Sequence, residues 1–296
     1  MIYTITLSPS IDYYMTIENI DMNKEVNRTS AEKVVPGGKG INVSLRLKDL
    51  GLHSIALGFL GGFSGKFIRE SLKKSGITED FTEIKAPTKI NVKLPKMDTA
   101  INAKGPVISN DEVESFMKKL KNFEENDTVI ISGSIPRGFS DDAFLEMIKL
   151  LREKKTFIAL DTHPYYISLA MKIGVNFIKP NLPELETLTE ILGLKDKPQT
   201  LEKLITQGID VMHTRGPKGV LFINQTNYIE VPAINVNVKN TVGAGDTSIA
   251  GYIYCKEMGY DKKYSVIFAN KLASYYVSQE PGKKLNIADF KSTMEV

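Results

Sequence analysis

The stretch Asn240-Thr241-Val242-Gly243-Ala244-Gly245-Asp246-Thr247 stands directly before the apolar run Ser248-Ile249-Ala250-Gly251-Tyr252. The run predicts a helix, and the three small residues at its start leave backbone N–H groups free to bind an anion. Asp246 follows this turn at once, where a carboxylate can take the proton of a hydroxyl that attacks a phosphoryl group. The alternative is a glycine-rich helix start in which Asp246 only complements the helix dipole. The stretch alone does not separate the two interpretations.

Composition limits the class of protein. The chain has 296 residues and is 42% hydrophobic, enough for one large α/β domain or two smaller ones. Its 38 basic and 35 acidic residues nearly balance, which argues against a nucleic-acid-binding or membrane-surface protein. One cysteine and three histidines make no recognisable zinc site. With no basic signal-peptide start and no apolar run of membrane-spanning length, we expect a cytoplasmic protein.

The order of the predicted elements favours an α/β fold. Strand patterns cover residues 2–7, 54–60, 127–132, 156–161, 175–178, 209–214 and 219–223. Helical patterns cover roughly residues 40–51, 65–75, 110–122, 140–154, 182–192, 198–207, 246–258 and 262–279. This alternation predicts a mostly parallel sheet with helices on both faces. Residues 11–35 and about 86–108 interrupt it with polar, strand-like sequence, so we expect a small β-sheet lid on a single domain that spans residues 1–296.

Three polar clusters fall near the starts or ends of these elements. The pair Gly37-Gly38 with Lys39 and Asn42 opens a helix and offers donors to hydroxyls or a phosphate; a tight turn explains the glycines but not the two polar side chains together. Asp12 ends the first strand, where a carboxylate can accept sugar hydroxyls or simply form a turn. Strand period places Lys89, Asn91 and Lys93 on one face of the lid, either as a clamp for an anionic substrate or as a protected edge strand.

Further clusters follow later strands. Asn181 with Glu184 fits a helix capping box, and the same oxygens could hold Mg²⁺ near nucleotide phosphates. Turns with hydroxyls or glycines close two more strands, at Ser132-Gly133-Ser134 and at Thr214-Arg215-Gly216-Pro217-Lys218-Gly219. The spacing of a Walker A loop is absent, and Gly58 to Gly65 lacks the G-x-G-x-x-G spacing of a dinucleotide loop.

Taken together, the clusters closely resemble the PfkB branch of the ribokinase family, and within it the 1-phosphofructokinases and tagatose-6-phosphate kinases. The resemblance runs from end to end and is carried by Ser8-Pro9-Ser10-Ile11-Asp12, Gly37-Gly38-Lys39-Gly40-Ile41-Asn42-Val43, Thr88-Lys89-Ile90-Asn91-Val92-Lys93, Ser132-Gly133-Ser134-Ile135-Pro136-Arg137-Gly138, Lys179-Pro180-Asn181 with Glu184, and Val242-Gly243-Ala244-Gly245-Asp246. It implies a three-layer α/β/α domain of ribokinase type with a small β-sheet lid.

The resemblance also implies a role for each matched position. Asp246 is the expected catalytic base, and Gly243, Ala244 and Gly245 supply the N–H groups of the anion hole. Substrate binding falls to Asp12, Arg28, Gly38, Lys39, Asn42, Lys89, Asn91 and Ser134. ATP binding falls to Lys179, Asn181, Thr214, Gly216, Lys218, Gly219 and Asn270, with Asn181 and Glu184 ordering Mg²⁺.

The implied reaction is the ATP- and Mg²⁺-dependent phosphorylation of a ketohexose monophosphate. We favour fructose 1-phosphate over tagatose 6-phosphate, and a non-catalytic sugar-phosphate sensor is the alternative from another class. Two departures from the family pattern stand out: Lys89 where arginine is usual, and Asp161-Thr162-His163-Pro164 where Asp-Thr-Ser-Gly is common. The exposed edges of lid strands suggest a homodimer through the lid.

Overall fold

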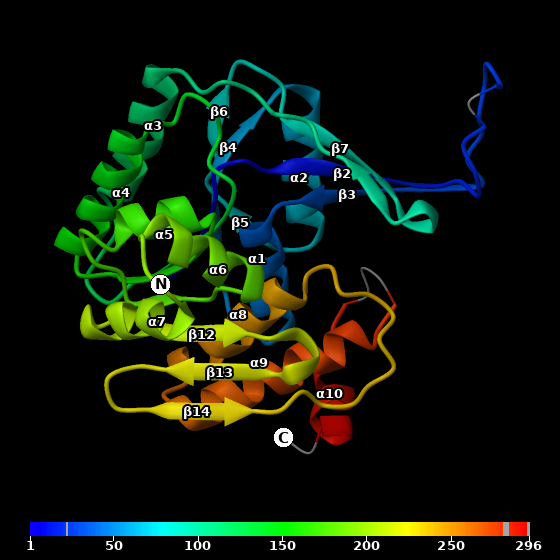
Figure 1. Cartoon of the computed structure of the whole chain (residues 1–296). Helices are drawn as coiled ribbons and strands as arrows, with labels where there is room; N and C mark the ends of the chain where they lie inside the picture. The colour runs from blue at the N-terminus through cyan, green and yellow to red at the C-terminus, as the bar shows by residue number, and fades with distance from the viewer. Residues whose placement is uncertain (22, 281–283, 295–296) are drawn as a thin grey trace.

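The structure, a computed structural model, describes residues 1–21, 23–280 and 284–294. A large sheet runs through the middle of the molecule (Figure 1). Its strands follow the order β14 (Tyr228–Val231), β13 (Val220–Ile223), β12 (Asp210–Thr214), β11 (Phe177–Ile178), β10 (Phe157–Thr162), β9 (Thr128–Gly133), β1 (Ile2–Thr6), β4 (Ile55–Gly61) and β5 (Thr78–Glu79), with β6 (Thr82–Ile84) also paired to β4. All pairs are parallel except those of β13 and β14. The expected mostly parallel sheet is therefore confirmed.

Helices cover both faces of this sheet (Figure 1). One face carries α3 (Asn110–Leu120), α4 (Asp141–Glu153), α5 (Pro164–Ala170), α6 (Leu182–Ile191) and α7 (Lys197–Thr206). The other carries α1 (Lys39–Asp49), α2 (Gly62–Lys74), α8 (Ala244–Glu257) and α9 (Lys262–Val277), with α10 (Ile287–Met294) packed against α9. None of the helices in the described ranges is long and apolar enough to cross a membrane.

Strand alternation explains why both faces need cover. In β9, Val129 and Ile131 pack into the core under α3 and α4, whereas Ile130 between them packs toward α1 and α8. Side chains of successive strand residues point to opposite faces, so an apolar run makes a strand that is buried on both sides. The carboxyl ends of the parallel strands are left as the one edge of the sheet where polar groups from several strands meet.

A second, four-stranded sheet projects from this body. It has the order β3 (Ala31–Gly37), β2 (Ser10–Thr16), β7 (Lys89–Leu94) and β8 (Thr99–Ile101), with a 3₁₀ turn at Pro95–Met97. The two segments expected to form a small sheet thus do pair with each other, although Met22 of the first lies outside the described residues. We call this element the small sheet; that it acts as a lid remains a prediction.

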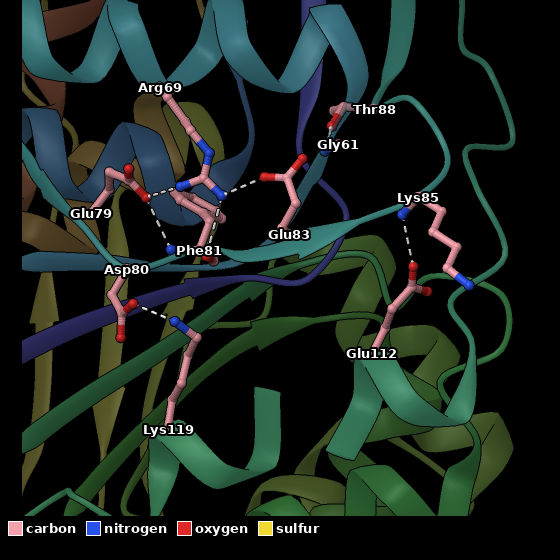
Figure 2. A network of polar contacts seen from close by, with 10 residues as sticks. All are labelled: Gly61, Arg69, Glu79, Asp80, Phe81, Glu83, Lys85, Thr88, Glu112 and Lys119. Atoms are coloured by element: carbon pink, nitrogen blue, oxygen red, sulfur yellow. Dashed lines mark hydrogen bonds and ion pairs between the residues drawn. The ribbon is translucent and has the colours of Figure 1, made fainter. Parts of the chain in front are cut away.

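The strand β7 enters the small sheet from a fixed point. The Gly61 N–H donates to Thr88 Oγ1 at 3.0 Å, and the Thr88 N–H donates to the Gly61 carbonyl at 2.9 Å. Nearby, the Arg69 guanidinium binds Glu79 at 2.6 Å and Glu83 at 3.1 Å (Figure 2). The segment before β7 is therefore tied to α2 and β4, which fixes where the small sheet starts.

Every predicted strand and helix is present, with ends that differ by a few residues. The pattern missed α5, which has seven residues and begins at a proline directly after a strand, and α10, β5, β6 and β14. These elements are short, so they hold too few residues to show a period of their own. Their positions come from tertiary packing instead.

Candidate active site

The helix α8 begins as an open anion-binding turn. Its N-cap Gly243 has a φ of 86° and no side chain caps the helix. This left-handed conformation favours glycine. Of the three N–H groups expected to bind an anion, that of Ala244 donates to the Thr241 carbonyl at 3.2 Å. Within the described residues the N–H groups of Gly243 and Gly245 have no acceptor, so two donors rather than three are open at this turn.

Asp246 lies in the first turn of α8 and is only 6% exposed. The Asn42 amide of α1 donates to its Oδ2 at 2.7 Å. Burial and the neighbouring charge of Asp161 raise the pKa of Asp246 to about 6, against the opposing effects of Asn42, Lys39 and Lys179. The carboxylate is therefore ionised at neutral pH and more basic than an ordinary aspartate, as a general base requires.

Two lysines flank a second buried carboxylate, Asp161, at the end of β10. Asp161 is 2% exposed, and its oxygens lie 3.3 Å from Lys39 Nζ and 3.4 Å from Lys179 Nζ. Burial alone would raise the pKa of Asp161, but the charges of Lys179 and Lys39 hold it below its ordinary value. A Cβ built on Gly245 would lie 3.0 Å from Lys179 Nζ, which places that ammonium at the start of α8. Asp161 thus holds two cations at the anion-binding turn.

In the sequence, Asp161 stands out only as part of an unusual turn. Its side chain becomes informative once β9, β10 and β11 are known to be neighbours, because Lys179 then follows the adjacent strand. A carboxylate that ends a buried strand is the sequence signal that could have identified it.

Asn181 and Glu184 form the capping box of α6. The Glu184 N–H donates to Asn181 Oδ1 and the Asn181 N–H donates to Glu184 Oε2, both at 2.9 Å. The other carboxylate oxygen, Glu184 Oε1, lies 3.9 Å from Lys39 Nζ. No group of three or more His, Cys, Asp or Glu that could hold a metal occurs among the described residues. A carboxylate oxygen such as Glu184 Oε1 is a type of ligand that Mg²⁺ accepts.

The polar face of the small sheet carries the predicted substrate groups. Asp12 lies opposite Asn91 in the ladder, and its Oδ1 accepts from Asn91 Nδ2 and Ser10 Oγ, both at 2.9 Å. Lys89 Nζ donates to Ser8 Oγ at 2.9 Å. Burial lowers the pKa of Lys89, and the nearby Asp12 partly opposes this effect. The strand register confirms that Lys89, Asn91 and Lys93 share one face.

A close backbone approach joins this face to α1. A Cβ built on Gly37 would lie 2.6 Å from Asp12 Cγ, and Gly38 is the N-cap of α1. The pair of glycines lets β3 pass directly against the Asp12 carboxylate, so Asp12 and the start of α1 lie next to each other. Lys39 and Asn42 then follow in the first turns of α1.

Two predicted substrate residues, Arg28 and Ser134, lie outside the polar face of the small sheet. Arg28 is exposed in the segment that joins β2 to β3, and this segment stands away from the α/β body in Figure 1. The structure does not bring Arg28 to Asp12 and Lys89. Ser134 is exposed just after β9, and the preceding Gly133 lies beside Lys39, since a Cβ on Gly133 would be 3.8 Å from Lys39 Cβ. Ser134 therefore lies at the same edge of the sheet as Lys39.

Four of the predicted nucleotide residues lie at the end of β12 and in the turn that follows it. Thr214 forms a bridge with Asn181, and Gly216 and Lys218 belong to the 3₁₀ turn Gly216–Lys218. A Cβ on Gly219 would lie 2.0 Å from the Val231 carbonyl oxygen, so this turn packs against the end of β14. Asn270 lies in the middle of α9, and its amide donates to the Pro232 carbonyl at 2.9 Å. The hydrogen bond positions the chain after β14, which gives Asn270 a structural contact on this side.

Comparisons with known proteins agree with this arrangement. The chain matches the sequence model of the pfkB family carbohydrate kinases over residues 5–285. It is 37% identical over 265 residues to a 1-phosphofructokinase of Borreliella burgdorferi, with 88% of this chain and 86% of that protein covered. It is 32% identical over 260 residues to a tagatose-6-phosphate kinase of Staphylococcus epidermidis, with 85% and 84% covered.

The fold has solved counterparts as well. The structure of phosphofructokinase-2 from Escherichia coli superimposes with a TM-score of 0.90 at 24% identity and covers 99% of this chain and 98% of that one. The expected fold class and enzyme class are confirmed. The chain belongs to the pfkB family of carbohydrate kinases, enzymes that transfer a phosphoryl group to a hydroxyl of their substrate.

Proposed function

We propose that this kinase phosphorylates fructose 1-phosphate to fructose 1,6-bisphosphate with ATP and Mg²⁺. The observation that carries the proposal is the position of Asp246: a buried carboxylate with a pKa raised to about 6, at the start of an uncapped helix. A sugar-phosphate sensor has no use for such a base. The relative from Borreliella burgdorferi is named 1-phosphofructokinase, which supports this substrate.

The α/β body supplies the groups for phosphoryl transfer. Asp246 takes the proton of the attacking hydroxyl, and Asn42 holds the carboxylate in place through its 2.7 Å hydrogen bond. The N–H groups of Gly243 and Gly245 bind the oxygens of the transferring phosphoryl group, with the Lys179 ammonium beside them. Phosphoryl transfer depends on positioning and charge neutralisation, and these fixed groups contribute to both.

The small sheet supplies the groups for substrate recognition. Asp12 and Asn91 bind sugar hydroxyls, and Lys89 binds the phosphate already on the sugar, together with Ser134 of the α/β body. Desolvation of Lys89 favours pairing with such an anion. Tagatose 6-phosphate is the alternative substrate, supported by the name of the Staphylococcus epidermidis relative. A ketohexose phosphate can be turned end for end in one site, so the two sugars use the same groups.

ATP and Mg²⁺ would bind on the other side of the phosphoryl site. Thr214, Gly216, Lys218 and Gly219 line the nucleotide side, and Asn270 fixes the chain beside it. Glu184 and the Asn181 side chain would hold Mg²⁺ through its water ligands, consistent with the capping contacts that both side chains already make. Bound there, the ion neutralises charge on the phosphates.

We also propose a homodimer through the small sheet. Its face opposite the polar one carries the row Val34, Tyr13, Val92 and Ile101, one residue from each strand. Val34 is 41% exposed and Ile101 is 65% exposed. Exposed apolar side chains such as Val34 and Ile101 favour burial against a second copy.

The test of the substrate is ADP production with Mg²⁺ and ATP on fructose 1-phosphate, tagatose 6-phosphate, fructose 6-phosphate, fructose and ribose. We expect the highest kcat/KM on fructose 1-phosphate. A preference for tagatose 6-phosphate would select the alternative, and activity on free sugars alone would refute the role of Lys89. No turnover together with retained sugar-phosphate binding would identify a sensor.

A further inference from the structure

A tyrosine of α9 lies directly against the anion-binding turn. The last turn of α9 reaches the start of α8, because the Lys239 and Asn240 N–H groups donate to the Val277 carbonyl at 2.8 and 3.2 Å. A Cβ built on Gly243 would lie 2.9 Å from Tyr276 Oη and 3.3 Å from its Cε1. The phenol of Tyr276 therefore touches the residue that opens the turn.

The ring of Tyr276 is held in place from α1. The Arg46 guanidinium lies 5.3 Å from the ring centroid, and Arg46 also pairs with Asp49 at 3.2 Å. Helical spacing puts Asn42, Arg46 and Asp49 on one face of α1. The helix that positions the base Asp246 through Asn42 thus also positions the Tyr276 ring.

The hydroxyl of Tyr276 has no hydrogen-bond partner in the part of the chain that the structure describes. The adjacent Tyr275 differs, since its hydroxyl binds Asp289. Burial raises the pKa of Tyr276, Arg46 opposes the rise, and the charges of Asp246 and Asp49 add to it. The phenol is therefore protonated at neutral pH and available as a donor at Gly243.

The open turn lacks one donor. A transferring phosphoryl group spreads its charge over three oxygens, whereas the turn offers only the N–H groups of Gly243 and Gly245, because Ala244 donates to Thr241. We propose that Tyr276 is a further catalytic residue, whose hydroxyl donates a hydrogen bond to the phosphoryl group at the start of α8. The inference rests on the function proposed above for this turn.

The test is the Tyr276→Phe variant, which keeps the ring and its contacts with Gly243 and Arg46. Steady-state kinetics with ATP and the preferred sugar phosphate should show kcat lowered roughly 100- to 1,000-fold, as for loss of one oxyanion donor, and both KM values changed less than about threefold. The melting temperature should stay near that of the wild type. The matched control is Tyr275→Phe, which removes the hydroxyl bound to Asp289 and should lower the melting temperature while leaving kcat unchanged.

A wild-type kcat in Tyr276→Phe would overturn the proposal. So would a raised KM for ATP with an unchanged kcat, which would assign the hydroxyl to ground-state nucleotide binding. A loss of kcat in the Tyr275→Phe control equal to that in Tyr276→Phe would also overturn it, because the effect would then come from packing of α9. Failure of the proposed function is distinguishable, since it would appear as an inactive wild-type enzyme.

Discussion

The α8 side of the candidate site buries its charges, whereas the small sheet keeps its charges half-exposed. Asp246, Asp161 and Lys179 are buried and lie in a chain of close charges and hydrogen bonds. Asp12 and Lys89 are only partly buried, and the Lys89 side chain donates a hydrogen bond to Ser8. Interactions are stronger away from water, so the first group suits chemistry that must be identical in every turnover. The second suits recognition, where groups must release their water and exchange partners.

Replacing the base Asp246 should have the largest effect on the α8 side of the site. In Asp246→Asn we expect kcat to fall by roughly 10³- to 10⁴-fold, because no group takes the proton, while sugar-phosphate affinity by calorimetry stays unchanged. Stability should rise at the same time. Raising the pKa of Asp246 from 3.8 to about 6 costs the folded protein roughly 3 kcal/mol at pH 7, and asparagine removes this cost.

The pH dependence of this stability difference provides a control. The cost is fully present above pH 6 and disappears as the pH falls toward 3.8, so denaturant midpoints of wild type and Asp246→Asn should converge near pH 4. Retained turnover in the variant would refute the assignment of the base. Equal stability of the two proteins at pH 7 would show that the Asp246 carboxylate is not desolvated as described.

Removing the charge between the two lysines should have the next largest effect. In Asp161→Asn, Lys179 stays buried without its counter-charge, so we expect a loss of roughly 3 kcal/mol in the free energy of unfolding. Loss of the Asp161 charge lowers the pKa of Asp246, since that charge now raises it. The acidic limb of the kcat–pH profile should therefore move to lower pH. An unmoved limb would contradict the coupling of the two carboxylates, because the titration of the substrate phosphate is the same for both proteins.

Substitutions in the small sheet should change KM for the sugar phosphate rather than kcat. In Lys89→Met we expect KM for the sugar phosphate to rise roughly 10- to 100-fold, the range for a lost charged hydrogen bond, with little change in kcat. Lys93 on the same face is the matched control, because its ammonium donates to Asn102 at 2.8 Å. Lys93→Met should raise KM less than about threefold. Equal effects of the two variants would mean that both lysines share the phosphate.

The sequence predicted the parts of this site that are formed by residues close together in the chain. Gly243 to Asp246 are contiguous, and the α8 turn was predicted as a unit. The face shared by Lys89 and Asn91 follows from strand period alone. These features depend only on local geometry, which a sequence pattern records.

Other features depend on which elements become neighbours. Asp161 holds Lys39 and Lys179 only because α1, β10 and β11 meet at one edge of the sheet. Tyr276 reaches Gly243 only because α9 ends beside the start of α8. Arg28 was placed with the substrate groups, yet its segment extends away from the body (Figure 1). A single sequence does not record such tertiary distances.

We expect the smallest effect on catalysis from substitutions on the face of the small sheet opposite the polar one. Ile101 is 65% exposed, so Ile101→Lys adds a charge without disturbing the core, and we expect light scattering to show a dimer for the wild type and a monomer for this variant. Because Asp246, Asp161 and Lys179 lie in the α/β body of one chain, kcat should change less than about twofold. Tyr228→Lys on the far edge strand β14, at a residue 67% exposed, is the control and should leave the mass unchanged. A monomeric wild type would refute the dimer, whereas a large loss of kcat on dissociation would mean that the small sheet is positioned by its partner as well as by its joint to β4.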